Sequence, residues 1–154
     1  MKVFKLKYTQ SIHSSIENVF DFFSNPENLS ILTPEELNFR ILTPTPIIMK
    51  EGQIIDYTIK LFGLKIRWRT IITEFNKNNS FVDQQLKGPY SMWHHKHIFK
   101  ERNGKVEMVD EISYALPFGI LGEIVNVIWV KKDLDKIFKY RENAINKYFK
   151  RKRL

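Results

Sequence analysis

Residues 92–116 read MWHHKHIFKERNGKVEMVDEISYAL, and this stretch decides how the rest of the chain is arranged. On either side of Asn103-Gly104, apolar and polar side chains alternate, as they do in strands that bury one face. Asn-Gly is a dipeptide typical of a two-residue hairpin turn. The stretch therefore predicts two antiparallel strands, over 92–101 and 105–116, joined by a tight turn.

The sequence before this hairpin has further strand patterns, interrupted by two short helices. Ser14 precedes Glu17 at the spacing of a capping box, which predicts a helix over 15–24. A second short helix is predicted over 27–32. Phe62-Gly63 is predicted to form a hairpin turn between two of the strands. The strands predicted in this part of the chain are 2–9, 37–43, 53–61, 64–75 and 80–87.

After Gly119 the pattern changes from period two to helical spacing. Apolar side chains recur at steps of three and four over about 119–150, with lysine, aspartate and glutamate between them. This pattern predicts one long amphipathic helix, and its apolar stripe needs the sheet as a partner. The expected fold class is α+β, with a curved antiparallel sheet of about six to seven strands wrapped round the helix. A space between sheet and helix is a natural place for a ligand.

Length and composition narrow the class of protein. A chain of 154 residues buries enough surface to fold as one domain, which we expect to span 1–154. Apolar residues make up 43% and charged residues 27%, as in ordinary globular proteins, so widespread disorder is not expected. The lack of cysteine excludes disulfides, iron–sulfur clusters, thiolate zinc sites and cysteine nucleophiles. The sequence contains no phosphate-binding glycine motif and no serine-hydrolase elbow.

The sequence also indicates the cellular compartment in which we expect the protein. No apolar run is long enough for a membrane-spanning helix. The opening MKVFKLKYTQ lacks the apolar core of a signal peptide. The lack of cysteine is compatible with a reducing compartment. We therefore expect a soluble, cytoplasmic protein.

The net charge of +8 is concentrated at one end of the chain. Residues 131–154 hold 10 Lys or Arg and 3 Asp or Glu, a balance of +7, whereas residues 1–130 hold 15 and 14, a balance of +1. A basic tail is expected at about 150–154. It is open to three interpretations: a solvated helix end, weak contact with an anionic membrane or an acidic protein, or non-specific attraction to nucleic acid. No base-reading motif accompanies the charge, so no specific nucleic-acid partner is expected.

Strand alternation also brings polar side chains to one aromatic face. Alternate residues of a strand share a face, so His95 and His97 lie with Trp93 and Phe99. The predicted Asn-Gly turn places both histidines at about the level of Asp110 on the next strand. The residues expected on this face are Trp68, Phe81, Asp83, Gln85, Trp93, His95, His97, Phe99, Met108, Asp110 and Tyr114.

Residues 81–97, FVDQQLKGPYSMWHHKH, and 107–119, EMVDEISYALPFG, resemble the START/Bet v 1 (SRPBCC) superfamily, in particular its bacterial cyclase/dehydrase-like branch. The element order is similar to the helix-grip fold over almost the whole chain. His94 stands where that branch is expected to have a basic residue such as arginine. The resemblance implies a cavity for a hydrophobic or amphipathic molecule, such as a lipid, isoprenoid or polyketide-like compound. It implies no particular reaction. The matching residues are Phe81, Asp83, Gln85, Gly88, Pro89, Tyr90, Trp93, His95, His97, Phe99, Met108, Asp110, Tyr114, Pro117 and Gly119.

The resemblance, the strand faces and the helix stripe together predict which side chains contact a ligand. Aromatic and branched residues would provide apolar contacts, and a few polar residues would orient the molecule. The predicted ligand-binding residues are Trp68, Phe81, Asp83, Gln85, Tyr90, Trp93, Phe99, Met108, Tyr114, Ile124 and Ile128, with Phe20 and Phe138 as further apolar contacts.

The polar cluster itself has four interpretations, because buried polar groups need partners. It can be a structural network, or it can hold the polar end of an apolar ligand. It can catalyse proton transfer in cyclisation or dehydration, with His95 or His97 as base and Asp110 orienting it. His95, His97 and Asp110 also have the donor types of a metal site. His-x-His alone is a weak signal, so neither a metal nor another cofactor is expected.

Small-molecule binding without catalysis is the leading hypothesis for the whole protein. An enzyme of the cyclase/dehydrase type, using a His–Asp pair, is one alternative. A different class is an interaction protein, in which aromatic side chains fill the core and the basic helix end docks on a partner. Uptake of an apolar dye separates the leading hypothesis from that class, because a filled core takes up no dye.

Overall fold

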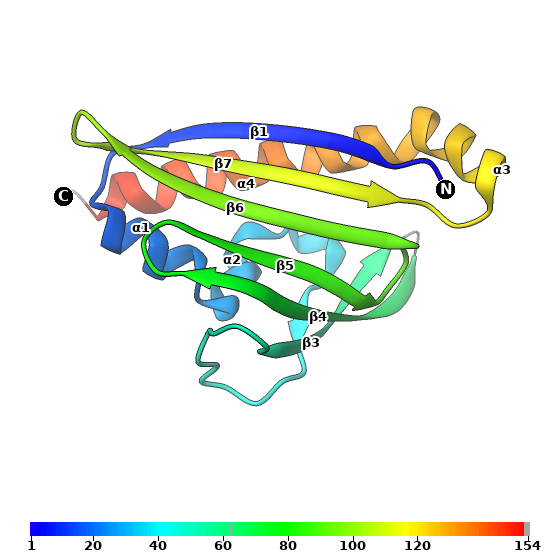
Figure 1. Cartoon of the computed structure of the whole chain (residues 1–154), viewed down its shortest axis with the longest axis horizontal. Coiled ribbons are helices and arrows are strands. Elements are labelled where there is room, and N and C mark those ends of the chain that lie inside the picture. Colours follow the sequence, from blue (N-terminus) through cyan, green and yellow to red (C-terminus); the bar gives the residue numbers. More distant parts are fainter. Residues whose placement is uncertain (62, 153–154) are drawn as a thin grey trace.

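The computed structural model describes residues 1–61 and 63–152, in which a long helix lies along one face of a curved sheet (Figure 1). Neighbouring strands are antiparallel, in the order β1-β7-β6-β5-β4-β3-β2. The strands are β1 (Phe4–Ile12), β2 (Arg40–Ile41), β3 (Ile54–Leu61), β4 (Leu64–Asn76), β5 (Ser80–Lys87), β6 (Met92–Arg102) and β7 (Lys105–Ala115). The helical elements are α1 (Ile16–Phe23), η1 (Pro26–Asn28), α2 (Leu29–Leu32), η2 (Glu35–Leu37), α3 (Gly119–Val125), η3 (Asn126–Val130) and α4 (Lys131–Arg151). The predicted α+β helix-grip fold is confirmed.

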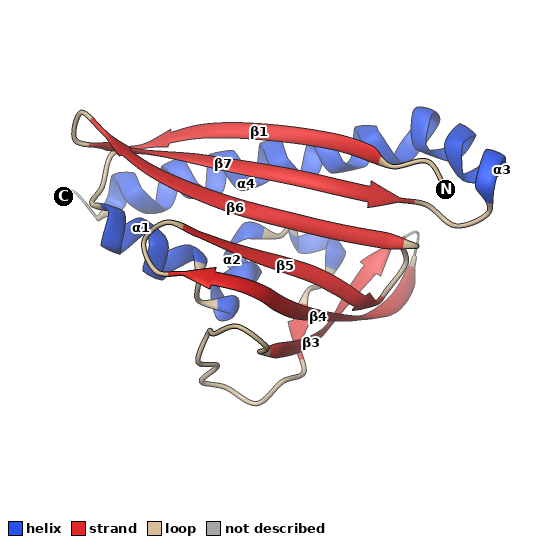
Figure 2. Ribbon diagram, in the orientation of Figure 1, coloured by secondary structure: helices blue, strands red, loops and turns tan. Residues whose placement is uncertain are grey.

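The hairpin of β6 and β7 has the register that its turn predicts. Asn103 and Gly104 both have positive φ, 52° and 72°, as this type of two-residue turn requires. His97 pairs with Asp110, and on the other side of β6, Asp83 pairs with His95. Residues directly opposite each other in a sheet share a face. Strands β5, β6 and β7, which lie side by side in Figure 2, therefore bring both histidines and both carboxylates to one face of the sheet.

Two local expectations differ from the structure. The predicted strand 37–43 is reduced to the short β2, because Asn38 takes a left-handed backbone (φ 45°) at the end of η2. Ser15 rather than Ser14 caps α1, since its hydroxyl accepts a hydrogen bond from the backbone N–H of Asn18 (3.2 Å). Both differences leave the predicted order of elements unchanged.

Two predicted features fall partly outside the described residues. Leu61 pairs with Leu64, so the connection between β3 and β4 is as short as predicted, but Phe62 of the Phe62-Gly63 turn lies outside the described residues. In the predicted basic tail, residues 150–152 are exposed at the end of α4, and 153–154 lie outside the described residues. Within residues 1–61 and 63–152, no helix is long and apolar enough to cross a membrane.

The predicted long helix is present, and it contains a π-helical segment. α3, η3 and α4 follow one another without a gap in the chain. Asn126, the first residue of the π segment, is buried, and its side-chain oxygen accepts a hydrogen bond from the hydroxyl of Tyr114 on β7 (2.5 Å). A π turn takes one more residue than an α turn and so rotates the faces that follow it. Asn126 at its start and Val130 at its end are both buried.

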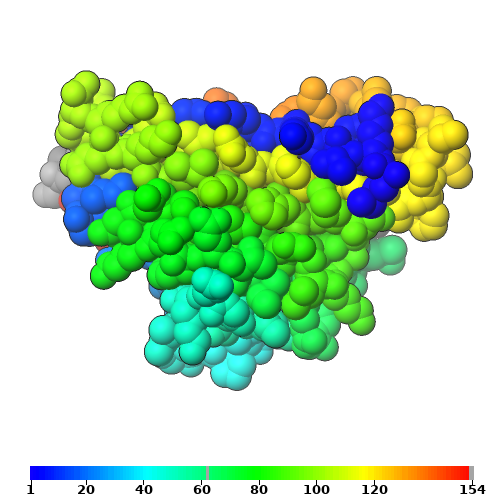
Figure 3. Space-filling view, viewed as in Figure 1, coloured from blue at the N-terminus to red at the C-terminus, as the bar shows by residue number. Residues whose placement is uncertain are grey.

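The apolar side chains of α3 and η3 are mostly exposed. Figure 3 shows α3 (yellow) at the edge of the molecule, where its surface is open. Ile124 is 51% exposed and Ile128 is 43% exposed. Neither isoleucine is among the side chains that line the cavity between sheet and helix. The stripe that packs on the sheet is formed further along the chain, by Val130, Leu134 and Phe138, because α3 lies at the end of the sheet.

Candidate functional site

A cavity of about 190 Å³ lies between the inner face of β3–β6, the segment from α1 to β3, and α4. Its wall is mostly apolar and aromatic, and its ionisable Asp and His side chains come from β5 and β6. The structure therefore provides the predicted space between sheet and helix. The predicted site residues that line it are Trp68, Phe81, Asp83, Tyr90, Trp93, His95, His97 and Phe138.

Part of the lining comes from residues that sequence reasoning missed. One group lies in the irregular segment between α1 and β3, including Leu37, Phe39 and Met49. This segment has no periodic pattern of apolar residues, so the sequence does not indicate which of its side chains point inward. Arg141 of α4 also lines the cavity. It stands three residues after Phe138 and four before Ile145 on the buried face, a spacing that could have identified it.

Several predicted residues lie away from the cavity. Phe99 and Met108 are buried in a separate core cluster with Phe20 of α1, which fills the space where a ligand was expected. Tyr114 is buried against η3 by its hydrogen bond to Asn126. These side chains do not line the cavity, because a helix packs on them.

Gln85 also has a local structural partner. Its side-chain amide donates a hydrogen bond to the backbone carbonyl of Tyr90 (2.7 Å), and its side-chain oxygen accepts one from the backbone N–H of Tyr90 (3.4 Å). These two bonds tie the end of β5 to the loop before β6. Gln85 therefore positions Tyr90, which lines the cavity, and does not line it itself.

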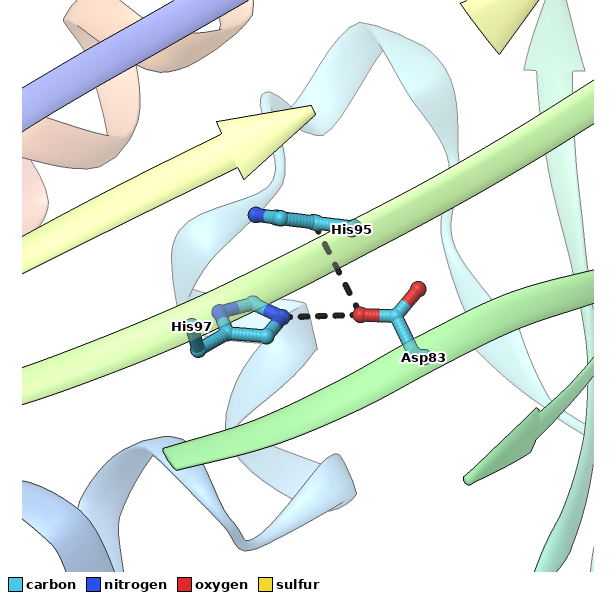
Figure 4. Close-up of side chains that lie close together, drawn as sticks. All are labelled: Asp83, His95 and His97. Carbon is cyan, nitrogen blue, oxygen red and sulfur yellow. Dashed lines mark hydrogen bonds and ion pairs between the residues drawn. The ribbon is translucent and has the colours of Figure 1, made fainter. Parts of the chain in front are cut away.

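Two histidines and two carboxylates form a buried cluster at one wall of the cavity. Nε2 of His95 lies 2.8 Å from Oδ1 of Asp110, and Nε2 of His97 lies 2.7 Å from Oδ2 of Asp83. Nδ1 of His95 is 3.7 Å from the same Asp83 oxygen (Figure 4), and Nδ1 of His97 is 3.1 Å from Oδ1 of Asp110. The two imidazole rings are tilted by 32° to each other, with centroids 3.8 Å apart. Each carboxylate therefore approaches both histidines, Asp83 from the cavity and Asp110 from behind.

Arg141 adds a positive charge behind this cluster. Its Nη2 lies 3.9 Å from Oδ1 of Asp110, and its guanidinium stands over the rings of Phe23 (5.4 Å) and Phe138 (5.6 Å). The residue is 9% exposed, so its charge is screened little by water. A buried arginine is stable when a carboxylate and aromatic rings compensate the loss of hydration. Arg141 therefore belongs to the site as the counter-ion of Asp110.

Both carboxylates are held in the ionised form. Burial opposes ionisation of Asp83, but the nearby His95 and His97 outweigh it and keep its pKa below the ordinary value. Burial also opposes ionisation of Asp110. There the charge of Arg141 and the contacts with both histidines hold the pKa well below the ordinary value. The cluster thus contains two negative charges, of which Arg141 balances one.

The two histidines differ in their affinity for a proton. Burial lowers the pKa of His95, and its neighbour His97 lowers it further, by more than the two carboxylates raise it. Burial also acts against the cationic form of His97, but its contacts with Asp110 and Asp83 outweigh burial and raise its pKa. Of the two histidines, His97 therefore has the higher affinity for a proton. A neutral histidine with one nitrogen held by a carboxylate can act as a base or as a ligand.

Three buried polar side-chain atoms of residues that line the cavity have no hydrogen-bond partner among the described residues. They are Nε1 of Trp68, Nδ1 of His97 and Nε of Arg141, and all three residues line the cavity. For His97 the contact with Asp110 is short but poorly directed. Unpaired buried donors cost free energy, so they are uncommon in folded proteins and call for an explanation.

Comparison with known proteins identifies the fold. No protein-family model and no curated protein matches the chain. Among solved structures, the Zhui aromatase/cyclase from Streptomyces sp. R1128 superposes with a TM-score of 0.75 at 9% identity, over 99% of this chain and 97% of that protein. Major latex-like protein 151 from Panax ginseng gives 0.70 at 11% identity, over 96% and 97% of the two chains. A protein from Thermus thermophilus gives 0.68 at 16%, over 92% and 96%.

At these low identities, the likenesses show the fold alone. The fold is the Bet v 1-like helix grip over nearly the whole chain, as the resemblance in the sequence implied. Proteins of one fold differ widely in what they bind and whether they catalyse a reaction. Function must therefore be argued from the cavity and its cluster.

Proposed function

We propose that this protein binds a hydrophobic or amphipathic small molecule, of the lipid, isoprenoid or polyketide-like kind, in the cavity between sheet and α4. The observation that carries the proposal is an apolar cavity with one ionic wall. Aromatic side chains such as Trp68, Tyr90 and Trp93 provide the apolar surface. The cluster of Asp83, His95 and His97 makes one end of that cavity polar and ionisable. In ligand pockets, a few such polar groups fix the orientation of the bound molecule.

The cavity volume limits what lies inside. An engineered cavity of about 150 Å³ in another protein is large enough for benzene. At about 190 Å³, this cavity matches one small ring system or a short branched chain. A longer ligand would bind with one end inside and the rest along the segment between α1 and β3.

The unpaired donors support one orientation for that ligand. Nε1 of Trp68 and Nε of Arg141 are N–H groups that lack partners among the described residues. A carbonyl or carboxylate oxygen at the ionic wall would accept hydrogen bonds from such donors after small side-chain rotations. The apolar part of the ligand would then face the aromatic wall. An amphipathic molecule with an oxygen at its polar end fits this arrangement better than a pure hydrocarbon.

A filled-cavity variant tests the proposal directly. Ile55 is buried and lines the cavity, whereas its neighbour Ile54 on β3 is 42% exposed. We expect Ile55→Phe to weaken binding of an environment-sensitive apolar dye at least about tenfold, because the larger ring occupies the cavity. Ile54→Phe is the matched control and should bind the dye as the wild type does. Absence of dye uptake by the folded wild type would contradict the proposal and favour a filled core.

Native mass spectrometry of protein purified without added ligand gives a second readout. A bound molecule appears as additional mass in the native spectrum that is lost on denaturation. We expect such a mass in the wild type and a reduced amount in Ile55→Phe. Its value identifies the size of the ligand, which the dye assay does not report.

A proton-transfer enzyme of the cyclase/dehydrase type is the second candidate function. It is favoured by the 2.8 Å contact between His95 and Asp110, which fixes the imidazole and leaves Nδ1 toward the cavity side. Such a base could remove a proton from a bound polyketide-like chain. Turnover of a confirmed substrate should then fall by about 100-fold or more in His95→Gln. His94→Gln, on the opposite face of β6, is the control, and unchanged turnover in His95→Gln would remove this candidate.

A further inference from the structure

Three ligand-type side chains converge at the cavity wall, from two adjacent strands (Figure 4). Asp83, His95 and His97 each provide one potential ligand atom, and these atoms lie within 4.8 Å of one another. We propose that these three residues form a binding site for one divalent transition-metal ion of the zinc class. The proposal is independent of the small-molecule ligand, because it concerns only the protein's own side chains.

Two of the three separations between ligand atoms bracket the value that zinc requires. Oδ2 of Asp83 lies 2.7 Å from Nε2 of His97 and 3.7 Å from Nδ1 of His95. Zinc bonds of about 2.0–2.1 Å in a tetrahedron separate neighbouring ligand atoms by roughly 3.3 Å. This value lies between the two measured separations. Small rotations of side chains on a rigid sheet would therefore complete the site, with no movement of the backbone.

A carboxylate lies beside the far nitrogen of each imidazole, and it holds that of His95 by a hydrogen bond. Nε2 of His95 contacts Oδ1 of Asp110 at 2.8 Å, and Nδ1 of His97 approaches the same oxygen at 3.1 Å. A ligating histidine usually donates its other N–H to a carboxylate, which fixes the ring and its tautomer. Asp110 occupies that outer position for both rings. The sequence pattern pointed to Asp110 as a ligand, whereas the structure puts Asp83 on the ligand side.

The geometry around His95 also favours a cation between this histidine and Asp83. When Nε2 of His95 donates to Asp110, Nδ1 presents a lone pair toward Oδ2 of Asp83, 3.7 Å away. Two electron-rich atoms then face each other in a buried site, which is unfavourable. A cation between them would convert this repulsion into two bonds. The same cation would replace the proton that Nε2 of His97 shares with Asp83, and that proton would leave to solvent.

The surroundings favour three protein ligands and one open position. Nη2 of Arg141 lies 3.9 Å from Oδ1 of Asp110, so Arg141 would keep that carboxylate paired and out of the coordination sphere. All three proposed ligands line the cavity, so the remaining position faces its interior. Three protein ligands with one open position are typical of zinc sites that bind water or another small molecule. A metal here would therefore hold the polar atom of a molecule in the cavity.

Titration with cobalt and zinc tests the site on the whole protein. Full-length protein without a polyhistidine tag is treated with a chelator, desalted and titrated with Co²⁺. The visible absorption of Co²⁺ reports binding by nitrogen and oxygen ligands at a low coordination number. We expect saturation at one Co²⁺ per chain and loss of the absorption when Zn²⁺ is added. Calorimetry with Zn²⁺ alone should give the same stoichiometry.

Matched variants separate this site from surface histidines. We expect His97→Ala and Asp83→Asn to abolish binding, and Asp110→Asn to weaken it about 10- to 100-fold, because the latter removes only the outer carboxylate. His94→Ala, on the opposite face of β6, should bind as the wild type does. Circular dichroism of each metal-free variant checks that the fold is retained, and the nearly isosteric Asp83→Asn keeps the test valid if His97→Ala fails to fold.

Two results would overturn the proposal. One is no saturable binding of Co²⁺ or Zn²⁺ by the folded wild type, which would leave the cluster as a hydrogen-bonded network. The other is equal loss of affinity in His94→Ala and Asp83→Asn, which would place the metal on the surface. Neither result bears on dye binding by the cavity, so failure of the metal site and failure of the proposed function are distinguishable.

Discussion

The space between the sheet and α4 has a filled half and a hollow half. In the filled half, α1 inserts Val19 and Phe20 between the sheet and the C-terminal part of α4, and both are almost completely buried. In the hollow half, η1, α2 and the segment up to β3 cover the opening without filling it. The same sheet thus makes a close-packed core where an amphipathic helix is inserted and a cavity where short irregular elements pass over it.

The ionic cluster lies at the boundary between the two halves. The ring of Phe81, part of the filled cluster, stacks on His97 with centroids 4.2 Å apart. Phe138 meets His95 edge-on at 5.8 Å from the side of α4. Aromatic packing therefore holds the imidazoles on one side and leaves their other side toward the cavity. The side chains of a polar site keep a better-defined geometry when the site borders a close-packed core than when it lies on a loop.

The largest expected effect is loss of packing in the filled half. Phe20 makes edge contacts with Phe75, Phe81 and Phe99 at centroid distances of 5.3–6.0 Å. We expect Phe20→Ala to lower the free energy of unfolding by about 3–5 kcal/mol in urea denaturation. Ile59→Ala, at the wall of the hollow half, should cost about 1 kcal/mol, because its side chain already lacks contacts on one side. Equal losses would mean that the two halves are packed alike.

The next effect is removal of the buried positive charge at the boundary. Arg141→Met keeps most of the side-chain volume but leaves Asp110 with an uncompensated charge. We expect a loss of about 3 kcal/mol in the free energy of unfolding, measured with denaturant at neutral pH. The double variant Arg141→Met/Asp110→Asn should recover part of this loss. A single variant as stable as the wild type would show that the histidines alone compensate Asp110.

A smaller effect is expected where the helix is held by one hydrogen bond. Next to the hollow half, the buried hydroxyl of Tyr114 donates to Asn126 at the start of η3. Asn126→Ala should lower the free energy of unfolding by about 1–3 kcal/mol, because that hydroxyl loses its partner. Asn143→Ala, on the outer side of α4, is the control. An unchanged melting temperature in Asn126→Ala would mean that the π segment is held by other contacts.

The smallest effect is expected on the outer face of the hollow half. Asp56 on β3 accepts two hydrogen bonds from Arg69, both 2.9 Å, and the pKa of Asp56 is lowered mainly by these bonds. A carboxyl group whose pKa is lower in the folded state stabilises the fold above its unfolded pKa, and this contribution is lost as the pH falls. The stability difference between wild type and Asp56→Asn should therefore shrink on acidification below about pH 4. Parallel stability curves from neutral to acidic pH would contradict this.

Much of the fold could be predicted because its signals are local. Alternation in β6 and β7 and the Asn103-Gly104 turn were enough to place His97 opposite Asp110, since strand period and turn length are properties of a few neighbouring residues. Helical spacing predicted the extent of α3 to α4 for the same reason. The strand over 37–43 was the weak point. There a left-handed residue at Asn38, which has no obvious signal, ends the pattern.

The candidate site was predicted in part. Asp83, His95 and His97 line the cavity as their strand face indicated. Phe99 and Met108 share that face but lie under α1, and a strand pattern contains no information about which part of its face a helix covers. Ile124 and Ile128 lie outside the cavity lining, and helical spacing cannot show where the sheet ends.

The sequence by itself determined the order of elements, the register of the central hairpin and the common face of Asp83, His95, His97 and Asp110. These follow from covalent geometry and from the alternation of side chains, which act within a few residues. Only the tertiary structure decided which half of the space is filled, that Asp83 rather than Asp110 faces the cavity side of the histidines, and that Arg141 stands behind them. Those arrangements depend on how α1 and α4 pack on the sheet, and packing is set by contacts between residues far apart in the chain.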